Sequence, residues 1–325
     1  MKVHLNPEVV RFLRAFSIVL AGIVFFDLII GGGLRYLYSN QRSGIFYRIS
    51  YAVNSTNAAC LVLGSSRAAH QYDPDVFENK LRSTFYNCGN DAHYLLYSCA
   101  VASAIIKRYS PKYIIFDIMP DEFAPSSSSL PLHKAQFSQL LPYHNNAAIW
   151  PYINLNSNFE RIKLVSKIYP YNSDLADLVS GLDQNAHKYN KGYIELVQSE
   201  EMLKYNVVDT TKIFTEDGAA DSLAYHTFCN LIAELRKKNV TVLLVISPLA
   251  FKCSDPITTS MCTLICKKYN NSRFMNFTNK PYWFRDKYFH DDFHLNGVGA
   301  KLFSAEVADF IKGNGVAHSP AYAAY

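Results

Sequence analysis

Five short apolar runs, separated by segments of helical periodicity, constrain the fold of this chain most strongly. Continuous apolar runs of this length are typical of strands that are buried on both faces of a parallel sheet. Segments 94–108, 220–238 and 295–312 carry apolar residues at helical spacing between or after them. The alternation predicts an α/β fold with a doubly wound, mainly parallel five-stranded sheet in three layers. The strands are expected at residues 59–64, 84–87, 113–118, 240–246 and, most weakly, 274–277.

The long stretch between the third and fourth predicted strands is interpreted as an insertion in the α/β domain rather than a separate domain. It begins with the polar loop Ser126–Ser129 and contains a predicted helix around residues 158–182. The chain is therefore predicted to begin with an N-terminal membrane anchor (1–35) and a juxtamembrane connector (36–57). The α/β domain (58–312), with its helical insertion at about 122–219, follows, and a tail (313–325) ends the chain.

Residues 15–33, AFSIVLAGIVFFDLIIGGG, carry a single charge, Asp27. As a helix this segment reaches roughly 30 Å, the thickness of one bilayer core. A signal peptide has a shorter apolar core and a small-x-small cleavage site, so an uncleaved single-pass anchor is favoured. Basic residues flank both ends of this segment, so the charge distribution does not indicate which end faces the cytoplasm. Two interpretations of Asp27 stay open: a polar contact with a partner membrane protein, or a position near the outer interface.

Composition excludes several classes of function. Hydrophobic residues make up 49% of the chain and charged residues 18%, which excludes wholesale disorder. The net charge of +5 includes no Lys/Arg run, so nucleic acid is not an expected partner. The seven cysteines form no C-x-x-C pair, and Cys262 and Cys266 lack further residues at ligand spacing, so no metal is expected. One disulfide, between Cys253 and Cys262, stays open for an exported domain.

Polar residues follow the predicted strands at their carboxyl ends, where open α/β sheets bind ligands. Further polar residues stand just before the last predicted helix. These segments are Gly64-Ser65-Ser66-Arg67, Asn87-Cys88-Gly89-Asn90-Asp91, Met119-Pro120-Asp121 and Asp291-Asp292-Phe293-His294-Leu295-Asn296.

These residue types suit acyl transfer. A serine hydroxyl becomes a nucleophile when a histidine takes its proton and a carboxylate orients that histidine. The pattern predicts Ser66 as nucleophile, His294 as base and Asp291 as orienting carboxylate, with Asp292 as the alternative. The N–H groups of Ser66, at a helix start, and of Gly89 are candidate oxyanion donors. The alternatives are that Ser66 is a helix cap and that Gly89 serves a turn of positive φ.

Together the blocks resemble those of the SGNH/GDSL hydrolase family over residues 58–312, about four fifths of the chain. The resemblance implies that Ser66 is nucleophile and first oxyanion donor, that Gly89 is a further donor, and that Asp291 and His294 complete the triad. The first block departs from the family's Gly-Asp-Ser, and the third-block Asn is absent. The oxyanion hole then has two donors, or Asn90 substitutes.

Both departures also occur in membrane-anchored members that resemble accessory proteins of cell-envelope polymer acylation. The resemblance implies an esterase or O-acyltransferase without cofactor that acts on an acylated glycan or envelope polymer. It also implies a multi-span membrane O-acyltransferase as partner, and an inner-membrane location with the domain facing the periplasm or cell exterior. A catalytically idle glycan-binding or scaffold module is the main alternative, and a soluble intracellular lipase or thioesterase is the third. Arg67 and His70 are candidate contacts to an anionic or sugar substrate, or else solvated helix residues.

Overall fold

A five-stranded parallel sheet forms the centre of the molecule. The computed structural model describes residues 6–125, 137–157, 159–173, 175–180, 191–197 and 207–313. The strand order is β2-β1-β3-β5-β7, and every neighbouring pair is parallel. This confirms the predicted fold class and all five predicted strands. Their bounds are Cys60–Leu63 (β1), Phe85–Asn87 (β2), Tyr113–Asp117 (β3), Thr241–Ile246 (β5) and Ser272–Asn276 (β7).

The central strands β1, β3 and β5 are mainly apolar because both faces of the sheet are covered. In β1, Leu61 and Leu63 pack into the hydrophobic core on one face, whereas Cys60 and Val62 pack into the core on the other. β3 and β5 alternate in the same way. The run of consecutive apolar residues in each strand therefore supplies two cores at once.

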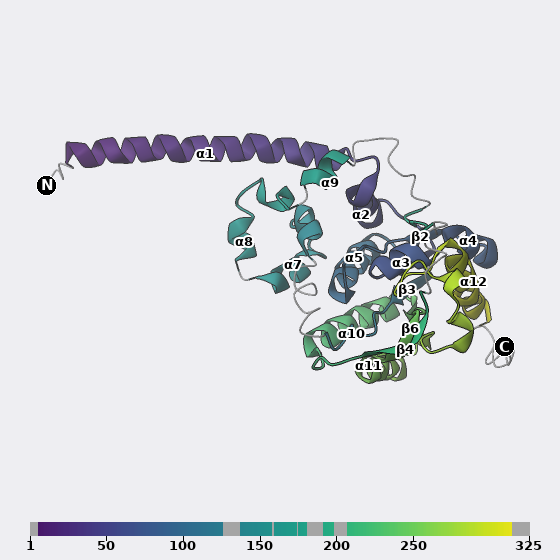
Figure 1. Cartoon of the computed structure of the whole chain (residues 1–325). Coiled ribbons are helices and arrows are strands. Elements are labelled where there is room, and N and C mark those ends of the chain that lie inside the picture. The colour runs from purple at the N-terminus through teal and green to yellow at the C-terminus, as the bar shows by residue number, and fades with distance from the viewer. Residues whose placement is uncertain are drawn as a thin grey trace.

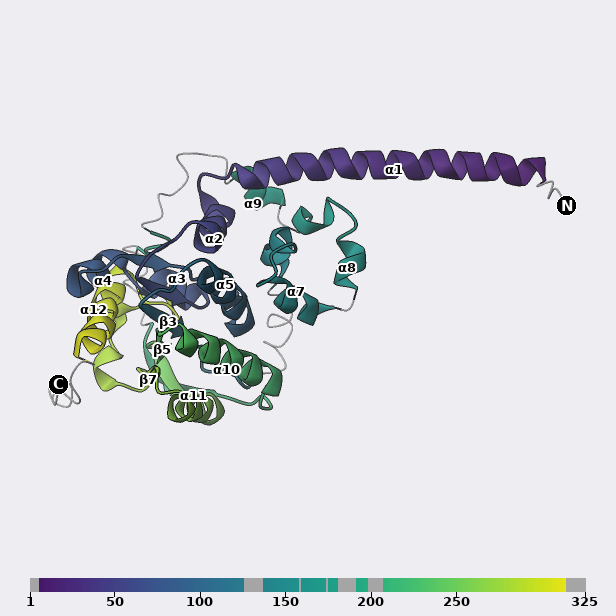
Figure 2. The same ribbon diagram turned by 180° about the vertical axis from the view of Figure 1, so that it is seen from behind.

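Helices form the two outer layers (Figures 1 and 2). One core contains residues of α2, α5, α10 and α11, and the other contains residues of α3, α4 and α12. Asp221 caps α10 by accepting a hydrogen bond from the Ala224 N–H at 2.9 Å. The bounds are Gly44–Asn54 (α2), Ser66–Gln71 (α3), Pro74–Leu81 (α4), Leu95–Arg108 (α5), Ser222–Lys237 (α10), Pro256–Lys268 (α11) and Gly297–Gly313 (α12).

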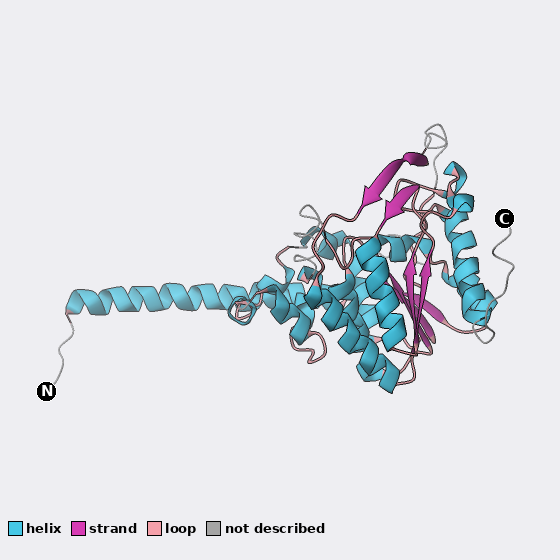
Figure 3. Ribbon diagram, turned by 90° about the horizontal axis from the view of Figure 1, so that it is seen from below, coloured by secondary structure: helices cyan, strands magenta, loops and turns pink. Residues whose placement is uncertain are grey.

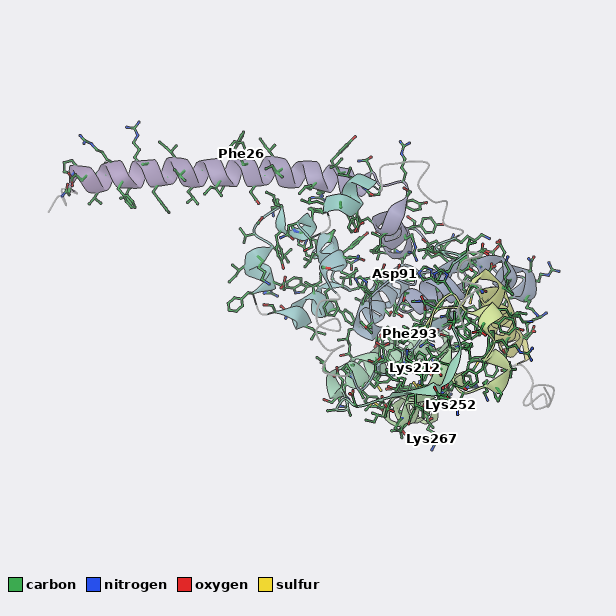
Figure 4. All side chains as sticks on the ribbon, in the orientation of Figure 1. Phe26, Asp91, Lys212, Lys252, Lys267 and Phe293 are labelled. Carbon is green, nitrogen blue, oxygen red and sulfur yellow. The ribbon has the colours of Figure 1, made fainter. Side chains whose placement is uncertain are left out.

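The N-terminal helix α1, Pro7–Ser39, projects from the domain (Figure 1). It is the one helix in the described ranges that is long and apolar enough to cross a membrane. Its apolar side chains, including the labelled Phe26, extend into free space around the helix (Figure 4). After residues 40–43, α2 occupies half of the predicted connector and packs on α5.

The segment between β3 and β5 differs from the prediction. The single helix expected around residues 158–182 is wrong: the described part of that range contains α8 (Glu160–Lys163), η2 (Tyr169–Tyr171) and α9 (Leu175–Ser180). Pro170 fixes its own φ and lacks an N–H, which interrupts helical pairing there. Residues 158, 174 and 181–182 lie outside the described ranges. Before α8 come η1 (Ser138–Tyr143) and α7 (Trp150–Asn156).

A second sheet also went unpredicted. β4 (Asp209–Thr215) pairs in parallel with β6 (Phe251–Ser254), and this pair stands apart from the central sheet (Figure 3). Along β6 burial alternates, with Phe251 and Cys253 buried, but β4 is almost wholly exposed. Two short 3-10 helices, η4 (Pro281–Trp283) and η5 (Asp286–Tyr288), follow β7.

The carboxyl-terminal part of α1 is docked on the insertion and on α2. The ring of Tyr38 is buried against Phe46, Tyr143 and Tyr171, at centroid distances of 5.2, 6.0 and 5.7 Å. Further along α1, the Asp27 carboxylate accepts hydrogen bonds from the Ser166 hydroxyl at 2.5 Å and the Lys167 N–H at 2.7 Å. Asp27 thus finds its hydrogen-bond donors within its own chain.

Candidate active site

Ser66 begins α3 directly after a tight turn at the end of β1. Gly64 makes this turn with φ of +151°, and a Cβ there would lie 2.8 Å from the Asp117 carbonyl oxygen. Both the backbone angle and the close approach require glycine. Ser66 as the first residue of α3 has an N–H that points out of the helix start, where the helix dipole favours negative charge.

His294 lies on the loop before α12 and contacts Ser66 directly. Its Nε2 is 2.7 Å from Ser66 Oγ. Its Nδ1 is 2.9 Å from each of the two carboxylate oxygens of Asp291. Asp291, His294 and Ser66 therefore form one continuous chain of hydrogen bonds, although Ser66 is far from the other two in the sequence. The chain has the order carboxylate, imidazole, hydroxyl that activates a serine.

The two neighbouring carboxylates have different partners. Partial burial tends to raise the pKa of Asp291, but hydrogen bonds from His294 and from the Phe293 and His294 N–H groups outweigh it and lower the pKa to about 2. Asp291 is therefore ionised at every pH at which an imidazole can act as base. Asp292 instead forms an ion pair with Lys212 of β4. The geometry distinguishes the two residues that the sequence left as alternatives.

The predicted oxyanion donors lie beside α3 but already have acceptors. Gly89 packs so closely on α3 that a Cβ would lie 2.3 Å from the Ala69 nitrogen. Its N–H donates to Asn87 Oδ1 at 2.9 Å. The Asn90 amide donates to Gln139 Oε1 at 2.7 Å. The structure thus brings the Gly89 loop to the start of the serine helix, with these two donors engaged in internal hydrogen bonds.

Arg67 and His70 are both buried, so the interpretation as solvated helix residues is wrong. Arg67 is fully buried, and its guanidinium donates to Ser247 Oγ at 2.9 Å and lies 3.7 Å from Asp117. This arrangement gives Arg67 a structural role behind the serine. His70 contacts the Ile194 carbonyl oxygen through Nδ1 and lies 3.4 Å from Asp91 through Nε2. Its ring meets that of the triad histidine at a centroid distance of 5.6 Å.

Several positioning residues were missed by sequence reasoning. Gln71, fully buried at the end of α3, donates to the Phe293 carbonyl oxygen at 2.9 Å and so ties the serine helix to the histidine loop. Asn296, by contrast, belongs to a polar segment that was selected from the sequence; it caps α12 by accepting from the Val298 and Gly299 N–H groups at 3.0 Å. Ser247 directly follows β5, so the rule about carboxyl strand ends would have found it had it been applied to the fourth strand.

Within the described ranges, no group of three or more His, Cys, Asp or Glu side chains is arranged to hold a metal ion. All seven cysteines are free, and Cys253 and Cys262 are not bridged. Burial raises the pKa of the Cys88 thiol, next to Gly89, to about 12, which keeps it protonated and poorly nucleophilic. Ser66 therefore stays the candidate nucleophile at this edge of the sheet.

Glu122 follows β3 and is a buried acid. Its two carboxyl oxygens accept the Leu95 N–H at 2.6 Å and the Met119 N–H at 3.1 Å, which joins the start of α5 to the loop after β3. Burial raises its pKa from 4.5 to about 8, against the opposing effect of these hydrogen bonds. As the pH rises, the folded protein therefore keeps the proton on Glu122 to a higher pH than the unfolded chain does.

This raised pKa predicts a pH-dependent stability. Between pH 4.5 and about 8 the folded state binds more protons at Glu122 than the unfolded state, so this residue lowers the free energy of unfolding as the pH rises. We expect the thermal midpoint of the wild type to fall from pH 5 to pH 8 more steeply than that of Glu122→Gln. Thermal unfolding of the two full-length proteins in detergent at pH 5, 6.5 and 8 measures the difference. Parallel curves for the two proteins would contradict it.

Comparisons with known proteins add little to this geometry. No family model matches the chain, and no curated protein matches it. Among solved structures, one named for a platelet activating factor from Streptococcus pneumonia aligns over 91% of this chain and 99% of its own, with 10% identity and a TM-score of 0.41. At that distance the likeness carries no conclusion about activity.

Proposed function

We propose that the chain is a membrane-anchored ester hydrolase or O-acyltransferase that uses Ser66, His294 and Asp291. The observation that carries this proposal is the unbroken hydrogen-bond chain from Asp291 through His294 to Ser66 Oγ. Each of these contacts is 2.9 Å or shorter, which is close enough for proton transfer. The ionised Asp291 holds the Nδ1 proton of His294, which leaves Nε2 free to take the serine proton.

The reaction follows from this arrangement. Ser66 Oγ attacks the ester carbonyl carbon and passes its proton to His294 Nε2. The tetrahedral intermediate collapses, and the departing alcohol takes that proton, leaving the acyl group as an ester on Ser66. Water or a sugar hydroxyl then gives its proton to His294 and attacks the acyl-enzyme, and Ser66 recovers its proton as it leaves. The N–H of Ser66 is oriented to stabilise the oxyanion in both steps.

The proposed substrate is an acylated glycan or envelope polymer, with the domain on the periplasmic or outer side of the inner membrane. The family resemblance of the sequence blocks and the candidate span in α1 support this assignment. A multi-span membrane O-acyltransferase is the proposed partner, because an acyl group must be delivered across or at the membrane before this domain can transfer or remove it. The buried Arg67 is not available for the substrate contact considered from the sequence, whereas His70 lies beside the triad histidine.

The engagement of Gly89 favours a second candidate function. Because its N–H already donates to Asn87 Oδ1, an incoming oxyanion would have to displace that contact. A catalytically idle scaffold or glycan-binding module would have no such requirement. A fluorophosphonate probe separates the two functions: stoichiometric labelling of Ser66 in the full-length protein supports the enzyme, and absence of labelling supports the idle module.

The triad assignment also predicts unequal effects of the two adjacent carboxylates. Asp291→Asn presents His294 with an amide that no longer stabilises the imidazolium, so ester turnover is expected to fall by about 10²–10⁴-fold. Asp292→Asn removes only the ion pair with Lys212 and is the matched control, with turnover expected to stay within a few-fold of the wild type. Steady-state hydrolysis of a generic acetyl ester measures both. Equal losses in the two variants would refute the assignment of Asp291.

A further inference from the structure

The insertion exposes apolar side chains around α8. Phe159, Ile162 and Val165 are 65, 68 and 73% exposed and follow one another at intervals of three residues; we call these three the α8 patch. Leu155 on α7, which contacts α8, is also exposed. Large apolar side chains gathered on a soluble surface normally mark a binding site for protein or lipid. Within the described part of the chain, nothing covers the α8 patch.

The position of the α8 patch beside α1 indicates which surroundings the patch faces. The turn that follows Val165 is fixed to α1, because Ser166 and Lys167 donate to the Asp27 carboxylate. Gly31, one helical turn further, approaches so closely that a Cβ would lie 2.3 Å from Lys167 Cβ. In Figures 1 and 4, α8 lies across from the part of α1 that carries the labelled Phe26. The patch is therefore held beside the apolar helix rather than beside the α/β domain.

Helix geometry gives the depth of this contact. Asp27 precedes Gly33, the end of the apolar segment, by six residues, which corresponds to about 9 Å along the helix axis. Side chains of interfacial segments reach about 5–10 Å into the boundary between headgroups and acyl chains. The hydrogen bonds from the insertion satisfy the Asp27 carboxylate at this depth, where an unpaired charge would be costly.

We propose that the α8 patch inserts into the lipid leaflet on the side of the α/β domain. Exposed basic residues alternate with it: Arg161 and Lys163 on α8, and Lys167 in the following turn. Apolar side chains interleaved with lysine and arginine are typical of segments that lie at the surface of an anionic membrane. The inference rests on the proposed anchoring through α1 and not on the proposed ester chemistry. The insertion is then a second membrane contact that sets the orientation of the active site.

Quenching by brominated lipids tests the inference with the full-length protein in liposomes that contain anionic lipid. Tryptophan is introduced in three single variants, and the emission of the two native tryptophans is subtracted by means of the wild type. Ile162→Trp probes the α8 patch. Ile23→Trp probes the middle of the candidate span and reports on anchoring alone. Leu264→Trp is the matched control, since Leu264 is 52% exposed on α11, far from α1 (Figure 1).

We expect the emission of Ile162→Trp to be quenched more strongly by lipids brominated near the headgroup than by lipids brominated near the chain end. Ile23→Trp should show the reverse order, and Leu264→Trp no quenching. Quenching of Ile23→Trp with none of Ile162→Trp would overturn the inference while leaving the anchor intact, and would assign the patch to a protein partner. Quenching at neither position would overturn the anchor and the lipid contact together. The triad experiments use a soluble ester and are independent of all three outcomes.

Discussion

Ser66→Ala is expected to lower ester turnover by about 10³-fold or more and to abolish labelling by a fluorophosphonate probe. The reason is that Ser66 Oγ is the one hydroxyl in contact with His294 Nε2, at 2.7 Å, within the described residues. The protein should still fold, because the loss of one partly exposed hydroxyl and its hydrogen bond costs only about 1 kcal/mol. Turnover of a generic acetyl ester by the purified full-length protein provides the measurement.

Ser65→Ala is the matched control for this experiment. Ser65 is adjacent in sequence and buried, and its hydroxyl has no hydrogen-bond partner in the described part of the chain. Its removal should leave turnover within a factor of about two and labelling unchanged, since no hydrogen bond links its hydroxyl to His294 in the described part of the chain. Turnover of Ser66→Ala close to that of Ser65→Ala would exclude Ser66 as nucleophile and leave the scaffold function as the better account.

The largest effect on stability is expected at Arg67. Arg67→Met should lower the free energy of unfolding by about 3–5 kcal/mol, because it leaves the buried Asp117 carboxylate without its countercharge. The guanidinium hydrogen bonds to the side chain and backbone carbonyl of Ser247 are lost as well. Burial already raises the pKa of Asp117, and Arg67 opposes that rise. Urea unfolding of the detergent-solubilised protein measures the loss.

A second variant distinguishes a lost charge pair from general damage to the core. In the double variant Arg67→Met, Asp117→Asn the uncompensated charge is gone, while Tyr72 keeps an acceptor in place of the carboxylate oxygen that it now contacts at 2.6 Å. We expect the double variant to be more stable than the single variant. If Arg67→Met alone costs less than about 1 kcal/mol, the ion pair does not hold the serine helix in place.

The sheet could be predicted because local sequence and tertiary burial agree there. The buried positions of β1 and β5 are all apolar, and those of β3 are apolar except for Asp117 at its end. Each strand is bounded by a polar or glycine-containing turn, so period and length identify all three without knowledge of their neighbours. The residues of the hydrogen-bonded triad could be selected for a related reason. The carboxyl ends of parallel strands meet at one edge, which brings Ser66 and the His294 loop together once the topology is known.

The insertion and the engaged donors could not be predicted, since both depend on contacts between distant segments. The parallel pair β4–β6 joins a largely exposed strand to one that follows β5, and the exposed residues of β4 carry no strand-like alternation. An arginine on a helix is usually solvated. The burial of Arg67 depends on its contacts with Ser247 and Asp117, which lie at the ends of two other strands. Asp27 likewise finds Ser166 through folding of the insertion against α1.

The short joint between α1 and the domain has a kinetic consequence. Residues 40–43 separate the two helices, and Gln41 at this joint donates to the Leu178 and Leu37 carbonyl oxygens at 2.8 and 3.0 Å. Even fully extended, four residues reach only about 14 Å. If Ser66 is the nucleophile of a chain anchored through α1, it works at a fixed height above the lipid and searches in two dimensions. Its turnover would then follow the areal density of polymer attached to that membrane, and segments beyond this height would remain unmodified whatever their bulk concentration.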